Sequence, residues 1–332
     1  MGKAERDGGP SCWVVSDGRA GNENQCLGLA RALGLAPEVK RIRARAPWRW
    51  LAPSLWLGVR RALDPSGDTL APPWPKVLIA TGRISVAPAA ALRRASGGAT
   101  FAIQIQNPTI DPGRFDVVVA PAHDRLSGPK VIATLGAMHG VDQASLDQAA
   151  ARFGPRLAHL PRPRIAVLIG GDSKVHRLRP EATRRLAEQL AELARRDGVG
   201  LMVTTSRRTG AENIEILRRG LEGLAVDLWD GAGENPFYGY LALAEGILVT
   251  EDSVNMVSEA AATGKPVQVI GLEGGSARQE RFHRAMGEAG ITRPFDGHLE
   301  HWSYPPFNET QRVAEEIGRR MATRTAPVDG PT

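Results

Sequence analysis

The chain has 332 residues, of which 42% are hydrophobic and 23% are charged. This composition is typical of a folded globular protein, and it excludes a chain that is disordered throughout. No apolar run approaches the roughly 18 residues of a membrane-spanning helix, and the N-terminal stretch lacks the apolar core of a secretory signal. Only two cysteines are present, Cys12 and Cys26, which excludes a disulfide scaffold and favours a reducing compartment.

The excess positive charge lies entirely in the first half of the chain. Residues 1–150 hold 18 Lys and Arg against 12 Asp and Glu, whereas the remainder holds 24 of each. Seven of the cations lie between Lys40 and Arg61, with no acidic residue among them. A basic half beside a neutral half indicates that one part of the protein meets an anionic partner.

Short apolar runs alternate with helical stretches, as in α/β proteins with parallel sheets. Most runs are continuous, which is typical of strands buried on both faces. The expected strands are Cys12–Ser16, Val77–Ala80, Phe101–Gln106, Val117–Ala120, Ile165–Ile169, Gly200–Thr204, Ile247–Thr250 and Val267–Ile270. The expected helices are Asn24–Leu33, Ala87–Ala95, Pro180–Arg196, Ala211–Arg219, Val254–Thr263, Gln279–Ala289 and a last one at about Thr310–Met321.

A domain boundary is expected near residues 155–164, because this stretch has three prolines and no clear element. We therefore expect two Rossmann-like domains with parallel sheets. The expected division is a disordered tail at 1–10, domains at 11–155 and 161–305, a helix at 306–322 that could pack on either domain, and a disordered tail at 323–332.

Two loops of the first domain could carry chemistry. Gly18 and Gly21 follow the first strand, and a helix is expected to start near Asn22, so free N–H groups could meet an anion or a sugar hydroxyl. The second expected strand, Val77–Ala80, leads into Thr81, Gly82 and Arg83 before another helix. Both loops should lie at the carboxyl edge of one sheet, where α/β proteins bind ligands. The alternatives are ordinary turns and, for Arg83, a surface cation. The residues expected on this acceptor side are Gly18, Gly21, Asn22, Thr81, Gly82 and Arg83.

The second domain opens with a loop that suits a phosphate. Gly170 and Gly171 follow its first strand, and Asp172, Ser173 and Lys174 come next, which supplies bare backbone, a hydroxyl and a cation. The following strand ends in hydroxyl residues and the pair Arg207–Arg208, and arginine binds phosphate oxygens in bidentate fashion. A second phosphate contact at Ser206 and Arg207 is expected, and a solvated turn is the alternative.

The stretch from Ile247 to Ile270 is the most informative. Asp252 or Ser253 could cap the helix that follows the strand. Met256 and Glu259 share one helix face with Ser253, and a carboxylate at this place could accept hydrogen bonds from both hydroxyls of a ribose. A solvated surface charge is the alternative for Glu259.

A tryptophan-rich segment, Ala46–Leu63, interleaves Trp48, Trp50 and Trp56 with cations. Such interleaving suits an anionic membrane surface or the anionic part of a lipid-linked acceptor, so residues 40–61 are the expected contact. It could also suit single-stranded nucleic acid, but no RNA-binding motif accompanies it, and a nucleic-acid partner is not expected. The remaining alternative is a segment that packs on the first sheet.

Several stretches resemble the mitochondrial fission (elongated-mitochondria) family of plants and bacteria, over about Ser11 to Trp302. They are SDGRAGNENQCLGLARALG, ATGRISVAP, QIQNP, FDVVVAPAHD, VIATLGAMHGV, LIGGDSK, TTSRRTG and NPFYGYLALAEGILVTEDSVNMVSEAAATGKPV. The plant members of that family are linked to organelle division, which says little about chemistry in this chain.

The loop order is also similar to GT-B glycosyltransferases, especially the N-acetylglucosaminyltransferase that makes lipid II. The matching residues are the Gly170–Ser173 loop and VSEAAATGKP from Val257 to Pro266. The resemblance implies two Rossmann-like domains facing each other across a cleft, with Glu259 on the donor ribose and the helix from Ser253 at the diphosphate. It also implies that Gln279 contacts the donor sugar. No metal or other cofactor is expected, since GT-B enzymes need no bound metal and a DxD motif is missing.

The chain departs from those enzymes in the first glycine-rich loop. They carry a histidine there as catalytic base, whereas this chain has Gly21-Asn22-Glu23-Asn24. The expected base is Asp17 or Glu23. Asp17 is the better candidate because it directly follows a buried strand, whereas the helix dipole would keep Glu23 ionised and weakly basic. Asp17 could instead bind only backbone amides of its turn.

The leading expectation is a cytoplasmic protein, able to lie at the inner face of the membrane, that binds a nucleoside-diphosphate sugar. It would transfer the sugar to a lipid-linked or cell-envelope acceptor. The alternatives are a non-catalytic adaptor at membranes and a nucleotide-sugar epimerase, because the fold does not fix the reaction.

Overall fold

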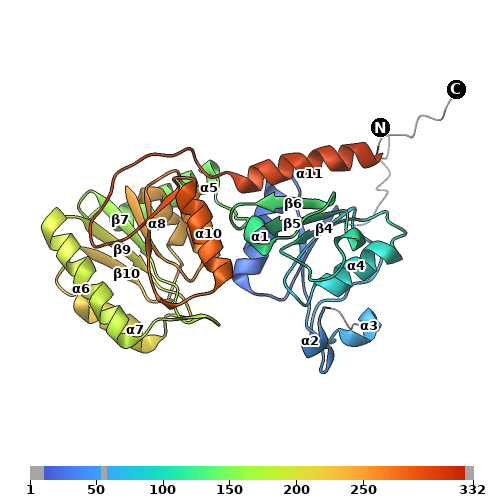
Figure 1. Cartoon of the computed structure of the whole chain (residues 1–332), viewed down its shortest axis with the longest axis horizontal. Helices are drawn as coiled ribbons and strands as arrows, with labels where there is room; N and C mark the ends of the chain where they lie inside the picture. Colours follow the sequence, from blue (N-terminus) through green and yellow to red (C-terminus); the bar gives the residue numbers. More distant parts are fainter. Residues whose placement is uncertain (1–10, 54–57, 326–332) are drawn as a thin grey trace, which may run out of the picture. The chain divides into compact units, whose positions relative to one another are not determined.

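The computed structural model describes residues 11–53 and 58–325 and divides them into two compact α/β units (Figure 1). The first unit contains the residues up to Gly140 and those from Asn308 onward, and the second contains Val141–Phe307. Each unit is built on one six-stranded sheet. The predicted α/β class, with two Rossmann-like units and parallel sheets, is confirmed.

The sheet of the first unit has the order β2-β1-β3-β4-β5-β6, and all neighbouring strands are parallel. Its strands are β1 (Cys12–Ser16), β2 (Glu38–Arg41), β3 (Val77–Thr81), β4 (Phe101–Ile105), β5 (Val117–Pro121) and β6 (Val131–Thr134). Strands β1, β3, β4 and β5 are buried along their whole length, because helices cover both faces of the sheet.

Two helices cover one face of this sheet and a third covers the other. α1 (Ala20–Ala32) and α11 (Glu309–Thr325) pack together on the first face, and α4 (Val86–Ala95) lies on the second. The short α2 (Trp48–Leu51) and α3 (Val59–Ala62) follow β2, and two 3-10 turns, η1 (Pro112–Arg114) and η2 (Ala122–Asp124), flank β5.

The last helix of the described chain, α11, belongs to the first unit. Its Val313 and Ile317 are fully buried in the core that α1 and the sheet form. Thr310 fixes its start, since the Oγ1 atom accepts from His139 N at 3.0 Å and donates to His139 O at 2.9 Å. The helix continues to Thr325, so residues 323–325, which were expected in a disordered tail, are helical. Residues 1–10 and 326–332 of the predicted tails lie outside the described residues.

The sheet of the second unit has the order β10-β9-β7-β11-β12-β14 and is also parallel throughout. Its strands are β7 (Arg164–Leu168), β9 (Gly200–Thr204), β10 (Val226–Trp229), β11 (Gly246–Thr250), β12 (Val267–Ile270) and β14 (Thr292–Pro294). A separate antiparallel pair joins β8 (His176–Arg177) to β13 (Glu273–Gly274).

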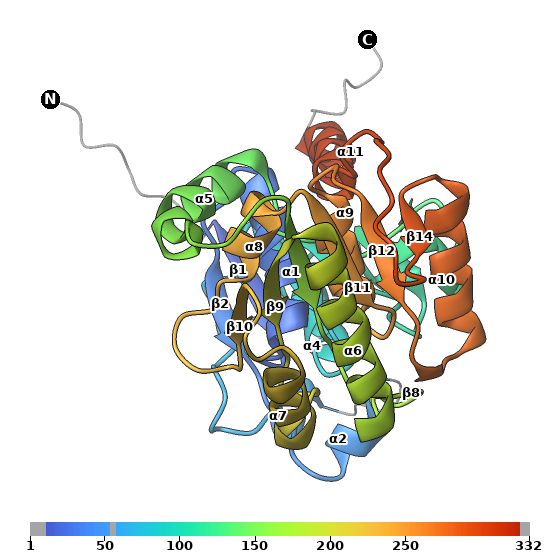
Figure 2. The same cartoon turned by 90° about the vertical axis from the view of Figure 1, so that its left-hand side faces the viewer.

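Helices cover both faces of the second sheet as well. α6 and α7 pack on one face, as Figure 2 shows for β9 and β10, and α8 and α9 contact the strands from the other face. The helices are α5 (Gln143–Leu157), α6 (Pro180–Asp197), α7 (Ala211–Gly220), α8 (Phe237–Leu243), α9 (Val254–Ala261) and α10 (Ala277–Glu288).

The division between the units lies at Gly140, earlier than the expected boundary near 155–161. Helix α5 causes the difference, because its apolar face packs on α8 of the second unit. The contact is close: a Cβ atom at Gly239 would lie 2.6 Å from the Phe153 ring. The proline-rich stretch therefore connects α5 to β7 within one unit. None of the described helices is long and apolar enough to cross a membrane.

Candidate functional site

The strand order of the second unit places a topological switch point at the carboxyl edge of its sheet, the expected position of a ligand crevice. The chain runs from β7 to β9 and β10 on one side, and then returns to β11 on the other side of β7. Ligands of open α/β sheets bind at such a switch point. Gly170 and Gly171 follow β7, and Asp252 and Ser253 follow β11, so the predicted loops meet there.

Asp252 joins the two loops across the switch point. Its carboxylate is fully buried and accepts hydrogen bonds from Thr250 Oγ1 at 2.7 Å and from Gly171 N at 3.2 Å. Its Oδ2 atom also forms an ion pair with Arg208 Nη1 at 2.5 Å. These bonds occupy the carboxylate, so Asp252 holds the loops in place rather than facing a ligand.

The two glycines are required by the packing of these loops. A Cβ atom at Gly170 would lie 2.3 Å from the carboxylate oxygens of Asp252, and one at Gly171 would lie 2.1 Å from Arg208 O. Gly171 also has a φ of +142°, which other residues rarely adopt. The Gly-Gly pair thus lets three loops approach each other at one edge of the sheet.

The predicted hydroxyl residues are engaged inside the loops, whereas the predicted cations are not. Ser206 Oγ donates to Gly170 O at 2.6 Å, and Ser173 Oγ accepts from Val175 N and His176 N at 3.2 and 2.9 Å. Lys174 and Arg207 are exposed, and neither has an ion-pair partner among the described residues. These two cations remain available to an anion.

Helix α9 starts at the same edge, and Ser253, Met256 and Glu259 lie on one face of its first two turns. Ser253 caps the helix, because its Oγ atom accepts from Met256 N at 3.3 Å. Glu259 is half-buried, and its carboxyl has no hydrogen-bond partner among the described residues. Desolvation raises the pKa of Glu259 to about 8. A desolvated carboxyl without a partner near a ligand crevice is a candidate functional group.

Gln279 also lies at this crevice. Ser276 caps α10, and Gln279, in the first turn, donates from Nε2 to Asp252 O at 3.3 Å. Its Oε1 atom accepts from Ser276 Oγ at 3.1 Å. The structure thus brings Gln279 together with the Gly170–Ser173 loop and the start of α9.

Two histidines and a glutamate near this edge were not expected to belong to the site. His176, on β8, is buried, and its Nε2 atom lies 3.8 Å from Glu251 Oε1. His283 Nε2 lies 2.8 Å from Glu251 O, and desolvation lowers the pKa of His283. Of these residues, His176 had a signal in the sequence, which was its position directly after the glycine loop. They link α10 and the β8–β13 pair to the end of β11.

The first unit has a switch point of its own, between β1 and β3. Asp17 follows β1, and its Oδ1 atom accepts from Arg19 N at 3.2 Å and from Asn22 Nδ2 at 3.4 Å. Gly82 follows β3 with a φ of +83°, and a Cβ atom there would lie 3.0 Å from Asn22 Nδ2. The two predicted loops therefore meet, and Asp17, Asn22 and Gly82 lie side by side.

Glu23 is held in an ion pair. Its carboxylate accepts from Arg41 Nε at 2.9 Å, from Arg41 Nη2 at 2.7 Å and from Ser16 Oγ at 3.1 Å. The bond from Arg41 lowers the pKa of Glu23. A carboxylate stabilised in this way is a poor general base. Asp17 has a longer ion pair, 3.4 Å from Oδ2 to Nε of the exposed Arg19, and is therefore the better placed of the two predicted bases.

The remaining acceptor-side residues have different surroundings. α1 starts at Ala20, so Gly21 and Asn22 lie in its first turn, and Gly18 has a φ of +77°. Thr81 is buried, and its hydroxyl has no hydrogen-bond partner among the described residues.

Gln106 is a residue that sequence reasoning missed. It follows β4 with a φ of +71°, and its Nε2 atom donates to Asn22 Oδ1 at 3.2 Å. The only sequence signal was its place in the QIQNP stretch.

Arg83 does not face the switch point. Its Nε atom donates to Ala52 O at 2.5 Å, and its Nη2 atom donates to Trp50 O at 2.7 Å. The predicted Trp-rich segment is thereby attached to the loop after β3. Trp56, the third tryptophan of that segment, lies outside the described residues.

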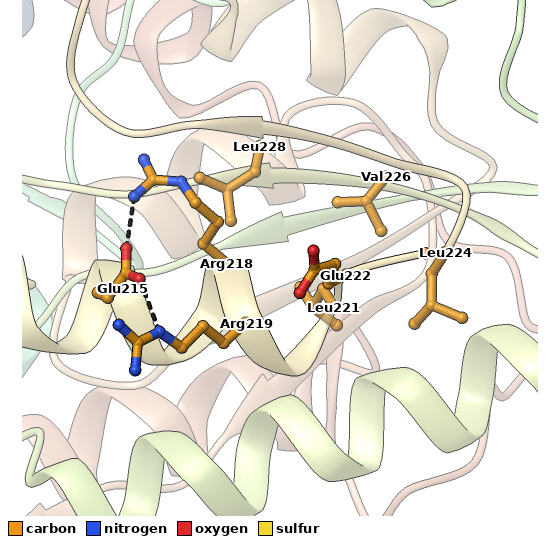
Figure 3. Close-up of a pocket in the computed structure, with 9 residues that line it drawn as sticks. Glu215, Arg218, Arg219, Leu221, Glu222, Leu224, Val226 and Leu228 are labelled. Atoms are coloured by element: carbon orange, nitrogen blue, oxygen red, sulfur yellow. Dashed lines mark hydrogen bonds and ion pairs between the residues drawn. The ribbon is translucent and has the colours of Figure 1, made fainter.

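A cavity of about 480 Å³ lies elsewhere in the second unit, between α7 and the edge strand β10 (Figure 3). Leu221, Leu224, Val226 and Leu228 form its apolar part, and Arg218 and Arg219 both pair with Glu215 on its polar side. None of the predicted site residues lines this cavity. The described part of the chain contains no group of three or more His, Cys, Asp or Glu residues that could hold a metal ion.

Comparison with solved structures supports the fold. A putative UDP-N-acetylglucosamine 2-epimerase from Listeria monocytogenes is 13% identical with a TM-score of 0.59, over 97% of this chain and 99% of that one. The epimerase of Methanocaldococcus jannaschii in complex with UDP-GlcNAc and UDP is 13% identical with a TM-score of 0.52, over 94% and 99%. MurG of Acinetobacter baumannii is 13% identical with a TM-score of 0.51, over 93% and 100%. The chain shares their GT-B fold.

Comparison with known sequences gives the family. The mitochondrial fission protein ELM1 of Arabidopsis thaliana is 29% identical, over 94% of this chain and 91% of that protein. The uncharacterized protein RP120 of Rickettsia prowazekii is 26% identical, over 92% and 97%. The family model of mitochondrial fission ELM1 matches residues 20–321. The chain therefore belongs to the mitochondrial fission ELM1 family.

Proposed function

We propose that the protein binds a nucleoside-diphosphate sugar at the carboxyl edge of the second sheet and transfers the sugar to a lipid-linked or cell-envelope acceptor. Glu259 is the observation that carries the proposal. Its desolvated carboxyl has no partner among the described residues and lies on the helix that starts at the switch point. Two vicinal ribose hydroxyls would supply the donors that it lacks.

The diphosphate would lie between the glycine loop and the start of α9. Free N–H groups and the helix dipole favour an anion there. Lys174 and Arg207 supply two exposed cations from neighbouring loops. Gln279, which already donates to Asp252 O, lies where it could contact the sugar.

The comparisons support this ligand class. One of the proteins with the same fold was solved with UDP-GlcNAc and UDP bound. This support is for the ligand class, a nucleoside-diphosphate sugar, because at 13% identity the likeness is one of fold.

Transfer would use the first unit. Asp17 would take the proton from an acceptor hydroxyl, whose oxygen would then form a bond to the anomeric carbon of the sugar. The bond from that carbon to the diphosphate oxygen would break, and the leaving diphosphate would be stabilised by α9 and the two cations. No step needs a metal ion.

Titration calorimetry with UDP, GDP and their sugars tests the binding step. We expect the wild type to bind a nucleoside diphosphate and Glu259→Ala to bind it more weakly by about 1–3 kcal/mol, the usual contribution of hydrogen bonds to a charged group. Glu280→Ala is a matched control, because Glu280 is an exposed glutamate on α10. Equal affinity of Glu259→Ala and wild type would contradict the assignment.

Two observations favour a second function, that of a non-catalytic adaptor. The first loop has no histidine, and Glu23 is fixed by Arg41. An adaptor would bind a nucleotide without transferring a sugar, or would bind no nucleotide. In both cases Asp17→Asn would leave the activity of the protein in cells unchanged. An epimerase, the third reading, would convert the free sugar nucleotide without any acceptor, which NMR of the sugar detects.

A further inference from the structure

The first unit presents an exposed apolar pair on α2. Trp50 is 62% exposed and Leu51 is 39% exposed. Among the large hydrophobic residues that the structure describes, only Val175 of the second unit is comparably exposed. Trp50 and Leu51 are adjacent, and a one-turn helix carries them away from the sheet beside α3 (Figure 1).

Exposed arginines surround this pair. Arg43, Arg45, Arg49 and Arg61 are exposed, and the Arg49 guanidinium lies 5.1 Å from the centre of the Trp50 ring. Backbone bonds keep the segments together, because Arg45 N donates to Ala62 O at 2.9 Å and Asp64 N donates to Arg43 O at 2.9 Å. We call Trp50, Leu51 and these four arginines the α2 tip.

Asp64 is an acidic side chain near the α2 tip, and backbone and side-chain hydrogen bonds from Ser66, with smaller contributions from the charges of Arg45 and Arg43, lower its pKa. Asp64 is engaged in its own turn, where Ser66 N donates to Oδ1 at 2.9 Å. The four arginines therefore outnumber the carboxylate. This combination of an aromatic residue, an aliphatic residue and surrounding arginines suits the interface of an anionic bilayer. There, aromatic side chains lie at the level of the headgroups and arginines bind lipid phosphates.

We propose that the α2 tip docks on the surface of an anionic membrane, with Trp50 and Leu51 entering the headgroup region and the arginines on the lipid phosphates. The charge complementarity selects a lipid surface over an apolar protein partner. No arginine of the tip has an acidic partner in an ion pair among the described residues, so each is available to a phosphate.

Arg83 connects the tip to the loops at the switch point of the first unit. Its two hydrogen bonds to Trp50 O and Ala52 O cap the end of α2, and its neighbour Gly82 packs beside Asp17 and Asn22. Arg83 is thus a positioning residue that fixes the tip relative to the loop containing Asp17. The consequence of this connection rests on the proposed function: membrane docking would bring a lipid-linked acceptor in the same leaflet close to Asp17.

Vesicle sedimentation of the full chain tests the docking. We expect binding to phosphatidylcholine vesicles that contain phosphatidylglycerol, little binding to phosphatidylcholine alone, and release by high salt. Replacing Arg43, Arg45 and Arg49 by Gln should weaken binding by about tenfold or more, since each cation near an anionic surface contributes. The control replaces Arg184, Arg185 and Arg195 of α6, which are also exposed, and should change binding less than about twofold.

The apolar half of the tip has its own measurement. Brominated lipids should quench tryptophan fluorescence in the wild type, and Trp50→Phe should remove most of the quenching whereas Trp302→Phe should not. Leu51→Ser should weaken binding, and Val175→Ser should not. Equal binding to neutral and anionic vesicles, or equal losses in the tip and control variants, would overturn the proposal.

Hydrogen exchange tests the connection through Arg83. On anionic vesicles, the amides of α2 and of Thr81–Arg83 should both become protected in the wild type, and only those of α2 in Arg83→Gln. No protection of Thr81–Arg83 in the wild type would overturn the connection. Glu259→Gln should leave vesicle binding unchanged, and the tip variants should leave nucleotide binding unchanged. Failure of the proposed function and failure of this inference are therefore distinguishable.

Discussion

Asp252 and Arg208 form an ion pair of 2.5 Å in which the carboxylate is fully buried and the guanidinium is partly exposed. The same guanidinium lies 3.4 Å from Gly171 O and from Asp172 O. One aspartate and one arginine therefore hold the ends of β7, β9 and β11 in register. The crevice of the second unit depends on this pair, because it fixes the backbone that would face a ligand.

Asp252→Asn should destabilise the second unit by about 1–3 kcal/mol. The amide keeps one acceptor for Thr250, but it removes the charge that satisfies Arg208 and the Gly171 N–H. Thermal unfolding would show a lower Tm for this unit. Asp296→Asn is the matched control, because Asp296 is part of an exposed turn. Equal Tm values for the two variants would contradict the role of Asp252.

Gly170→Ala should also destabilise the second unit, by about 1–3 kcal/mol, because its Cβ atom would meet the Asp252 carboxylate. The backbone at Gly170 does not have a positive φ, so the effect is steric alone. Gly271→Ala is the control, since nothing lies within 4 Å of a Cβ atom there. Chemical denaturation of both variants measures the difference, and similar midpoints would speak against the close packing.

Glu259 should make stability depend on pH. Its pKa is about 8 in the folded chain, against an ordinary value of 4.5, so the folded state keeps a proton that the unfolded state has lost between these pH values. Stability should therefore fall as pH rises from about 4.5 to about 8, by on the order of 1–3 kcal/mol. Glu259→Gln should remove this slope in Tm measured from pH 5 to pH 8.5. An unchanged slope would show that another group is responsible.

Nucleotide binding should release a proton near pH 7. Ribose hydroxyls donate to the ionised carboxylate of Glu259, so the ligand would lower its raised pKa. Calorimetry in buffers of different ionisation enthalpy measures this release. The apparent enthalpy should vary with the buffer in the wild type and not in Glu259→Gln.

Asp17 and Glu23 should differ as bases. If a donor and acceptor pair is turned over, Asp17→Asn should abolish the reaction, whereas Glu23→Gln should reduce it only a few-fold, because Arg41 keeps Glu23 ionised and weakly basic. Survival of turnover in Asp17→Asn together with its loss in Glu23→Gln would reverse the assignment. No turnover with any donor, and no effect of either change in cells, would favour the adaptor.

The buried strands could be predicted because their apolar runs are continuous. Each of the eight expected strands is present, with bounds within one residue of the expected ones. The expected strands did not include the four edge strands of the two sheets, β2, β6, β10 and β14. Two of these, β2 and β14, consist of polar or proline-containing stretches, EVKR and TRP. Edge strands have one unpaired side and tolerate such residues, so their pattern resembles that of a loop.

Helix α5 shows why the domain boundary was misplaced. Its Phe153 and Leu157 face the core of the second unit, but Pro155 lies between them and made the stretch resemble a linker. A helix joins the unit against which its apolar face packs, and the sequence does not show which surface that is. The same reason left the place of α11 open.

The positions of the candidate site's loops could be predicted from the sequence, whereas the hydrogen bonds of its side chains could not. The loops after β7 and β11 and the position of Glu259 follow from the order of strands, turns and helices. Asp252, Ser206 and Ser173 were expected at a ligand, yet their side chains hold the loops, because hydrogen-bond direction is decided by the neighbours that folding brings together. Arg83 points to α2 for the same reason.

Calorimetric titration of the wild type and Glu259→Gln with nucleoside diphosphates and their sugars tests the central claim most directly. The account predicts that at least one nucleoside diphosphate binds the wild type, and that Glu259→Gln, although it folds with an unchanged or higher Tm at pH 8, binds it at least about tenfold more weakly. Absence of binding by the wild type to every nucleotide tested, or equal affinity in the variant, would contradict it.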